Sequence, residues 1–468
     1  MGNPGQNGFT LVRENFSLIA VGAFGYLVLL FLALSSYQIY LLLILGFAIT
    51  VGIAFRFPMT TVVALLITAV FPTIYQMTPI FDENYGAVGG GLNAVDIVLV
   101  GMAGASALQA WKSRRLKEDS LGLGRLVLLF ALWMLFEIVR NVSVYGISAP
   151  GEFRHRYLIL VLPLYVGLFF CTARERRKLF RLLAFSCLTL TFLSVPIIGT
   201  LKGWSLPTIG PQAARYLGSH ITLGLVYALV MLFLAQRHHY MKANRTPLWI
   251  TTIPVVFMVL IDSHRSVWLV SVIILISLVW LKEIQIRRFW RWGIPAALIV
   301  IIVWFTATEA GLDVVNFIST RGIAFVNPEE DETSAWRLAQ WETQIANFYS
   351  SPITGEGFGA HFGLSGWKGD VGISPHSLYV QTLVKIGIVG MFLYLVIVFK
   401  LLSAFKHWIK SQRGQGNSEI SLVLAAFVII IGAHAYYVAY AFEYYTWLFV
   451  GLGVAVVRSA PGVHSNGE

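Results

Sequence analysis

The sequence has 468 residues, of which 57% are hydrophobic and only 12% are charged, and its mean hydropathy is +0.72. These values lie far outside the range of soluble domains and predict a membrane protein. The net charge of +11 does not indicate a nucleic-acid partner, because the basic residues gather in short breaks between apolar stretches. Cys171 and Cys187 lie within or beside such stretches, which argues against a disulfide framework or a zinc ribbon.

Apolar stretches long enough to cross a bilayer recur from Phe16 almost to the end of the chain. They predict an all-α polytopic membrane protein with about 12 to 14 transmembrane helices, of which one or two short ones could be re-entrant. No cleavage-site pattern follows the first stretch, so we expect no removable signal peptide. The candidate spans lie near residues 17–35, 37–54, 58–75, 94–110, 126–139, 157–171, 182–200, 220–236, 248–262, 266–281, 293–308, 378–404, 420–439 and 445–457.

Basic residues fill every second break between these spans, which is the positive-inside bias and predicts that both termini are cytoplasmic. The opposite breaks are acidic or glycine-rich and include Glu152. We therefore divide the chain into N-terminal helices with about 11 spans (1–308), a large periplasmic loop (309–376), and C-terminal helices with a cytoplasmic tail (377–468). The basic breaks contain Arg56, Lys112, Arg176, Arg237, Lys282 and Lys410, among others.

The loop from Glu309 to Pro375 is far longer than the 2 to 8 residues usual between packed helices, so it is expected to be functional or disordered. Its many aromatic residues favour a folded, functional loop that contains short helices. Helical spacing places Leu338, Trp341, Ile345 and Phe348 on one face of an amphipathic helix that should end near residues 349–352.

Three arginines fall on the predicted outer side, against the charge bias: Arg215, Arg265 and Arg337. Arg265 is the most informative, because it lies in a very short break where a charge needs a partner or water. It could bind a ligand, pair with Asp262 or reach the membrane interface. The other outward arginines are interpreted as interfacial anchors or lipid head-group contacts: Arg140, Arg154, Arg156 and Arg321.

A glycine-rich segment, Gly355-Glu-Gly-Phe-Gly359, precedes a probable helix start at Pro375-His376-Ser-Leu-Tyr-Val-Gln381. Glycines allow a ligand or another backbone to approach closely, and proline suits a helix start. We expect His376 in the first turn of this helix, at the outer membrane edge. A helix N-terminus lowers the pKa of an imidazole, so a neutral, proton-accepting His376 is plausible there, although a lone histidine is more often structural.

Together these segments resemble the O-antigen ligase and O-antigen polymerase superfamily of bacterial lipid-linked glycan transferases. The resemblance is carried by Arg265-Ser-Val-Trp, by Trp336-Arg337, by Pro352-Ile-Thr-Gly355-Glu-Gly-Phe-Gly359, and by the stretch from Pro375 to Gly390. It covers about the second half of the chain in residues and the whole chain in architecture. Ser377 departs from the asparagine that follows the histidine in many relatives.

The resemblance implies a periplasm-facing active site in the bacterial inner membrane. There a glycan would move, with inversion, from undecaprenyl diphosphate to the hydroxyl of an acceptor glycolipid, either lipid A core or a second lipid-linked glycan. No metal or other cofactor is implied, because arginines can hold a departing diphosphate. Arg215 and Arg265 match such a clamp, Arg337 could assist phosphate or acceptor, and His376 matches the base.

The main alternative is an anion or solute transporter of the same superfamily. Transporters usually place ionisable residues near the bilayer midplane and have repeated halves, whereas the candidate residues here are at the outer edge beside a single loop. A glycan flippase would need a polar central cavity, for which the spans are too apolar. Polymerase and ligase differ only in the acceptor, and the sequence does not separate them.

Overall fold

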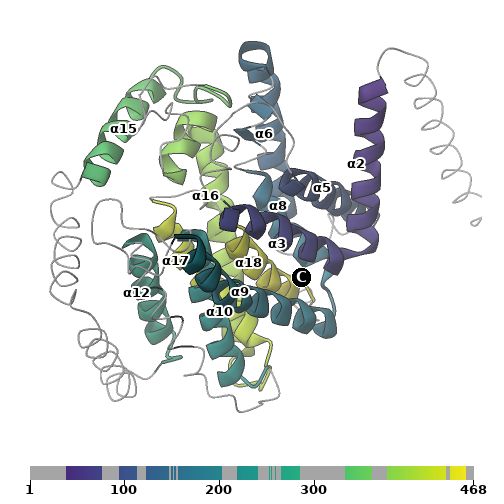
Figure 1. The fold of residues 1–468 in the computed structure, drawn as a ribbon, viewed down its shortest axis with the longest axis vertical. Helices are drawn as coiled ribbons and strands as arrows, with labels where there is room; N and C mark the ends of the chain where they lie inside the picture. Colours follow the sequence, from purple (N-terminus) through teal and green to yellow (C-terminus); the bar gives the residue numbers. More distant parts are fainter. Residues whose placement is uncertain are drawn as a thin grey trace, which may run out of the picture.

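The computed structural model describes residues 38–75, 94–112, 123–146, 149–150, 152–153, 157–202, 219–240, 252, 255, 259, 265–284, 332–360, 377–438 and 443–459. Within these ranges the chain forms helices and no strands, which confirms the predicted all-α class (Figure 1). The helices are α2 (Gln38–Arg56), α3 (Pro58–Tyr75), α5 (Ala94–Lys112), α6 (Leu123–Tyr145), η1 (Leu158–Leu160), α8 (Val161–Phe169), α9 (Ala173–Lys202), α10 (Ser219–Arg237), α12 (Arg265–Trp280), α15 (Glu332–Phe348), α16 (Leu378–Gln412), α17 (Ile420–Tyr436) and α18 (Tyr444–Ser459).

Two helices of the described chain, α6 and α16, are long and apolar enough to cross a membrane by themselves. A third candidate is a bent pair, in which Leu45–Arg56 and Pro58–Thr68 meet at 117°. Four described helical segments are apolar but shorter: Leu158–Phe169, Thr222–Arg237, Ser266–Trp280 and Ile420–Tyr436. The total of 12 to 14 spans and the three-part division of the chain stay predictions, since several candidate spans lie wholly or mostly outside the described residues.

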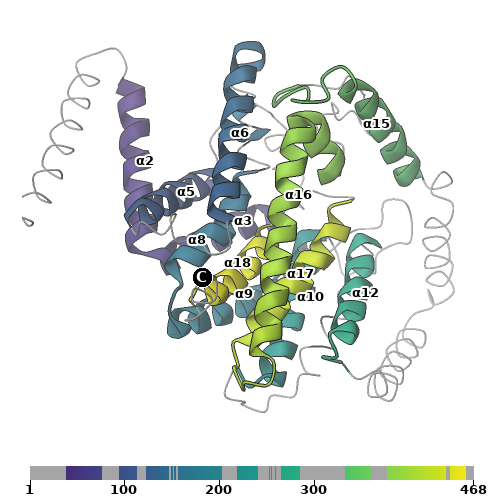
Figure 2. The same cartoon turned by 180° about the vertical axis from the view of Figure 1, so that it is seen from behind.

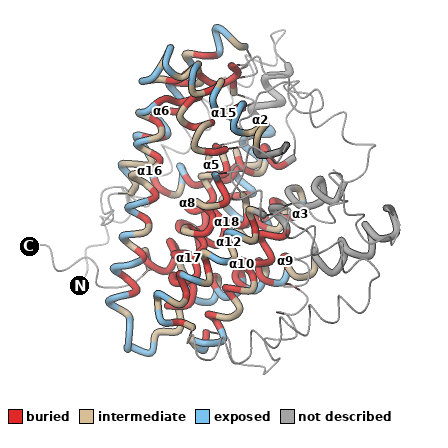
Figure 3. Tube along the Cα trace, turned by 90° about the vertical axis from the view of Figure 1, so that its left-hand side faces the viewer, coloured by how far each residue is buried: buried red, intermediate tan, exposed pale blue. Residues whose placement is uncertain are grey.

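The centre of the described structure is α18, which packs between α17 and α8. Every residue from Tyr445 to Val457 is buried, as expected for a helix that is apolar on all sides. Gly451 allows the close approach of α8, because a Cβ there would lie only 2.6 Å from the Cβ of Val166. Figure 3 shows this buried centre surrounded by helices whose outer sides are exposed.

The outer sides of several helices expose large apolar side chains that a soluble protein would bury. On α16 they include Ile388, Phe392 and Phe399, which are 57%, 64% and 66% exposed. Further examples on α6 and α12 are Leu128, Leu129, Leu132, Leu135, Phe136, Val139, Val272 and Ile276. Such continuous apolar surfaces are stable in contact with lipid, so the burial pattern agrees with a membrane protein.

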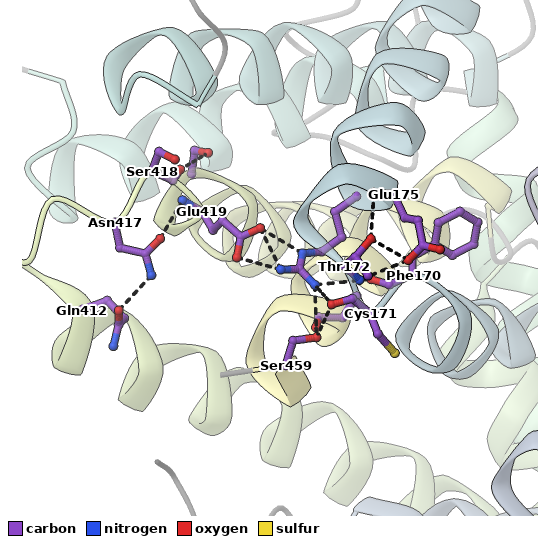
Figure 4. A network of polar contacts seen from close by, with 12 residues as sticks. Phe170, Cys171, Thr172, Glu175, Gln412, Asn417, Ser418, Glu419 and Ser459 are labelled. Carbon is purple, nitrogen blue, oxygen red and sulfur yellow. Dashed lines mark hydrogen bonds and ion pairs between the residues drawn. The ribbon is translucent and has the colours of Figure 1, made fainter. Parts of the chain in front are cut away.

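At one end of the helices, Arg176 joins the starts of α9 and α17 to the end of α18. Its guanidinium donates to both carboxylate oxygens of Glu419, each at 2.8 Å, and to the hydroxyl of Ser459 at 3.0 Å. Figure 4 shows Glu419 and Ser459 in this network, with Asn417 linking Glu419 to Gln412 at the end of α16. The side chain of Arg176 is only 4% exposed, so its contact with Glu419 is a largely buried ion pair that links α9 to α17.

A second charged cluster lies at the same end of α16, centred on Glu283, which follows α12. Glu283 accepts hydrogen bonds from Arg237 at 2.6 Å and His238 at 3.0 Å, and Arg413 lies 3.6 Å away. Burial acts to raise the pKa of Glu283, but the hydrogen bonds and charges of His238 and Arg237 outweigh it and hold the pKa below its ordinary value. Glu283 is therefore an ionised carboxylate that ties α10, α12 and α16 together.

The longest described helix, α16, has 35 residues and connects this charged end to the opposite end, where α15 lies (Figure 2). Basic connecting segments that are distant in sequence thus lie together at one end of α16. Glu152 and the glycine-rich segment contact the first turns of α16, at the other end. This arrangement is what the alternating charge pattern requires, and the assignment of the two ends to cytoplasm and periplasm stays a prediction.

Candidate functional site

The site is built around a break in α16 at Gly387. This residue has φ 68° and ψ −175°, so it interrupts the helix and separates a short first segment from the long remainder. A helix break leaves backbone carbonyl and amide groups without their usual partners, and when buried these must be satisfied elsewhere. Only glycine fits here, because φ is positive and a Cβ would lie 2.0 Å from the carbonyl oxygen of Ile353.

The segment that follows α15, residues 352–357, supplies the missing partners. The amide of Glu356 donates to the carbonyl of Val384 at 2.7 Å, and that of Gly357 donates to Lys385 at 3.0 Å. In the other direction, the amide of Ile388 donates to the carbonyl of Pro352 at 3.0 Å. The glycine-rich loop is therefore fixed to α16 by backbone hydrogen bonds on both sides of Gly387.

The loop also packs against the C-terminal half of α6. Gly357 has φ 94°, and a Cβ there would lie 2.0 Å from the side-chain oxygen of Asn141. The indole of Trp133, also on α6, donates to the carbonyl of Ile386 at 3.0 Å, which satisfies a further group at the break. The predicted close approach at these glycines is therefore an approach of the loop backbone to α6 and to α16.

Arg140 on α6 has a structural partner, which corrects its interpretation as a lipid-facing anchor. Its guanidinium pairs with the buried Glu137 at 2.6 Å and donates to the carbonyls of Gly355 at 2.9 Å and Thr354 at 3.3 Å. Because Glu137 is fully buried, it needs this cation close by. Arg140 therefore neutralises the charge of Glu137 and also fixes the loop to α6. Arg154, Arg156 and Arg321 lie outside the described residues.

A second buried ion pair joins the other side of the loop to α16. Lys385, which is 0% exposed, lies 2.9 Å from Glu152 and donates to the carbonyl of Ala360 at 2.6 Å. Glu152 also accepts the backbone amide of Gly359 at 2.7 Å, and Gln381 lies 3.5 Å away. The carboxylate and the ammonium thus neutralise each other, and each also forms a hydrogen bond with the backbone of the loop.

Phe358 fills the remaining space between the loop and the segment around Tyr157. Its ring is fully buried and meets the rings of Phe153 and Tyr157 edge-on, at centroid distances of 5.8 and 5.4 Å. Edge-to-face contacts of this kind add to the energy of burial. The hydroxyl of Tyr157 bonds Thr382 on the first segment of α16 at 3.3 Å. The loop is therefore a packed part of the fold.

The start of α16 is fixed to the end of α17. The helix begins at Leu378 with Ser377 as its N-cap, and the amide of Leu378 donates to the carbonyl of Tyr437 at 2.9 Å. The expected helix start is confirmed, while His376, which comes one position before the N-cap in the sequence, lies outside the described residues. In the nearby turn before α18, Glu443 accepts a hydrogen bond from Tyr436 at 3.4 Å. Burial raises the pKa of Glu443 to about 8.

The structure places only part of the predicted site. His376 and Arg215 lie outside the described residues, and Arg265 is the first residue of α12 with its side chain outside the described part. Arg337 is half-buried on α15. The helix expected around Trp341 is confirmed as α15, although Leu338, one of its four predicted apolar-face residues, is 39% exposed. Whether the three arginines and His376 converge stays a prediction.

A family model described as O-antigen ligase matches residues 250–395. This span contains α12 and three segments of the site, which are α15, the glycine-rich loop and the broken start of α16. This match supports the resemblance of the chain to the O-antigen ligase and polymerase superfamily. Comparison with curated proteins gives no match.

The matched family gives the site a chemical context. Members act as ligases or polymerases that join glycans, and their substrates are lipid-linked glycans. In the described part of the chain, no group of three or more His, Cys, Asp or Glu side chains could hold a metal ion. The described charges next to the loop are matched within the protein: Glu137 with Arg140, and Glu152 with Lys385.

Sequence reasoning did not single out these two pairs. Lys385 could have been found, because a lysine inside an apolar span is costly and implies a partner. Glu152 was recognised only as an acidic residue on the outer side, and nothing local indicated that its partner is a lysine 233 residues further along the chain.

Proposed function

We propose that this protein is a membrane glycosyltransferase that moves a glycan from undecaprenyl diphosphate to an acceptor hydroxyl on the periplasmic side of the bacterial inner membrane. The acceptor is lipid A core for a ligase or a second lipid-linked glycan for a polymerase. The observation that carries the proposal is the family match over residues 250–395, which coincides with the loop and helix break that the structure joins.

In the proposed reaction, the acceptor hydroxyl loses its proton to His376 as its oxygen attacks the anomeric carbon. The bond from that carbon to the diphosphate breaks, and the diphosphate leaves with the electron pair. Arg215 and Arg265 hold its oxygens, and Arg337 assists at phosphate or acceptor. General-base catalysis typically contributes about 10² to 10⁴-fold to such a step. The reaction needs no metal, because the arginines supply the positive charge.

The fixed loop supports this proposal in physical terms. A catalytic group must be held within a fraction of an ångström of its working position, so the segment that carries it needs a rigid support. The N-cap of α16 follows His376 directly in the chain, and α16 is held there by Tyr437, by the loop and by the Lys385 pair. The first segment of α16 is thus a fixed support that begins two residues after the proposed base in the sequence.

The arginines can be tested with purified protein in liposomes that contain the lipid-linked donor and an acceptor. Arg215→Lys and Arg265→Lys should lose most of the transfer rate, because lysine keeps the charge but not the planar, two-pronged donor geometry. Arg125→Lys, at an exposed position on α6, is the matched control and should keep the rate. Wild-type transfer should continue in EDTA. Full activity of both lysine variants, or loss of transfer on chelation, would contradict the clamp.

Deletion of the gene separates the two acceptors. Loss of long chains on every carrier indicates a polymerase, whereas long chains that remain on the lipid carrier indicate a ligase.

A further inference from the structure

Helix α15 buries polar side chains and exposes some of its apolar ones. Gln340 and Gln344 are 2% and 0% exposed, whereas Leu338 is 39% exposed and Tyr349, just after the helix, is 75% exposed. An amphipathic helix in a protein normally buries its apolar side. The burial of two glutamines on α15 therefore needs a reason other than the burial of apolar surface.

The buried glutamines belong to one continuous face. With about 100° of rotation per residue, Trp336, Gln340, Gln344 and Asn347 fall on the same side of the helix, with Arg337 and Trp341 beside them. Trp336, Arg337 and Trp341 are half-buried, in agreement with this placement. We call this set of six residues the inward face of α15. Glu342 and Ala339 on the opposite side are exposed.

Three polar atoms of the two glutamines on this face lack hydrogen-bond partners. Both polar atoms of the Gln344 side chain, and the side-chain oxygen of Gln340, are buried and make no hydrogen bond in the described structure. Buried polar groups in proteins are almost always hydrogen-bonded, and each exception requires an explanation. Such groups lower stability in the free protein, so their retention is most simply explained by a ligand that they bind.

The chemistry of the inward face matches a carbohydrate. An amide side chain carries both donors and an acceptor, which suits sugar hydroxyls because each hydroxyl also donates and accepts. Tryptophan provides a flat apolar surface with a single polar atom, suited to the apolar side of a sugar ring. Ligand sites generally combine aromatic walls with a few precisely placed polar groups.

The position of α15 connects this face to the site described above. Phe348, at the end of α15, packs against the buried cluster of Ala360, from the loop, and Val384, on the first segment of α16. The glycine-rich loop follows α15 directly and is hydrogen-bonded to that segment. We propose that the inward face of α15 binds sugar residues of a glycan substrate through Gln340 and Gln344, an inference that rests on the proposed glycosyltransferase function.

The test combines stability, binding and kinetics in one double variant, Gln340→Met with Gln344→Met. Methionine has nearly the same shape as glutamine without the polar atoms, so the fold should keep its thermal midpoint or gain slightly. Glu342→Met, on the exposed side of the same helix, is the matched control. The binding probe is the delipidated glycan, released by mild acid from the lipid-linked pool of the same bacterium, with tryptophan fluorescence as the readout.

The double variant should bind the delipidated glycan at least about 10-fold more weakly than wild type, while Glu342→Met binds normally. In the liposome assay, the KM should rise for the donor if the bound sugars belong to the donor, or for the acceptor if they belong to the acceptor. Unchanged binding and KM values in an active protein would overturn the inference and leave the proposed function standing. A clear fall in thermal midpoint would also overturn it, since the amides would then be structural. If wild type binds the glycan through these residues yet transfers none, the proposed function fails and the carbohydrate site remains.

Discussion

Removal of the buried Lys385 ammonium tests whether the pair with Glu152 holds the loop on α16. Lys385→Met keeps the length of the side chain but deletes the group that contacts Glu152 at 2.9 Å and the carbonyl of Ala360 at 2.6 Å. Glu152 would keep the amide of Gly359 but lose its counter-charge, and the Ala360 carbonyl would lose a hydrogen bond. Breaking a buried pair by removing one partner costs about 3–5 kcal/mol. We expect a loss of stability in this range.

The measurement is the free energy of unfolding in detergent micelles, followed by tryptophan fluorescence during titration with a denaturing detergent. The matched control is Lys406→Met, an exposed lysine on the same helix, which should change stability by less than about 0.5 kcal/mol. The double variant Glu152→Gln with Lys385→Met should be more stable than the sum of the two single effects implies, by about 0.5–3 kcal/mol. A Lys385→Met protein within about 1 kcal/mol of wild type, or strictly additive effects, would refute the proposed role of the pair.

Three further variants probe other parts of the same structure. Gly387→Ala should lower the free energy of unfolding by at least about 1–3 kcal/mol, because its positive φ disfavours a side chain and the new Cβ would meet Ile353. Gly52→Ala, with nothing within 4 Å of its Cβ, should be neutral or slightly stabilising, and equal effects of the two substitutions would contradict the role given to Gly387. Arg140→Met should speed hydrogen exchange at the amides of residues 356 and 357, whereas Arg125→Met on the same helix should not; unchanged protection would remove Arg140 from the loop contact. Glu443→Gln tests the raised pKa of this carboxyl: the wild type holds its proton more tightly when folded, so it should lose stability as the pH rises from about 4.5 through about 8, while the variant should not. Parallel thermal midpoints of the two proteins from pH 5 to pH 9 would show that the pKa is not raised.

The helical class and many element positions follow from apolar length alone. The spans expected near residues 126–139, 220–236, 266–281 and 420–439 correspond to α6, α10, α12 and α17, because an apolar segment in a bilayer must satisfy its backbone hydrogen bonds internally and a helix does so. Helix α16 extends beyond its expected end near residue 404, since its last turns carry charged side chains that continue the helix outside the apolar core. The 117° bend between α2 and α3 was not predicted, because hydropathy measures the length of an apolar segment and not its direction.

The site was predictable in its segments and not in its contacts. Glycine spacing correctly indicated a close backbone approach at residues 355–359, but the partner, the break at Gly387, is set by tertiary packing. The arginine at position 140 was taken for a lipid anchor because its partner Glu137, one turn away, was not considered. On α15 the helix itself was expected, whereas its buried polar face was not, since periodicity arguments assume that the apolar side turns inward.

The most direct test of the central claim is transfer by purified protein in liposomes that contain only the lipid-linked glycan donor and an acceptor, with wild type and His376→Ala compared side by side. We expect wild type to form the transferred product, and His376→Ala to retain the donor but transfer the glycan about 10² to 10⁴-fold more slowly. Wild-type activity should also fall as the pH drops through the imidazole pKa, expected near or somewhat below about 6.5. A near-normal rate in His376→Ala, or no transfer by wild type to either acceptor class, would contradict it.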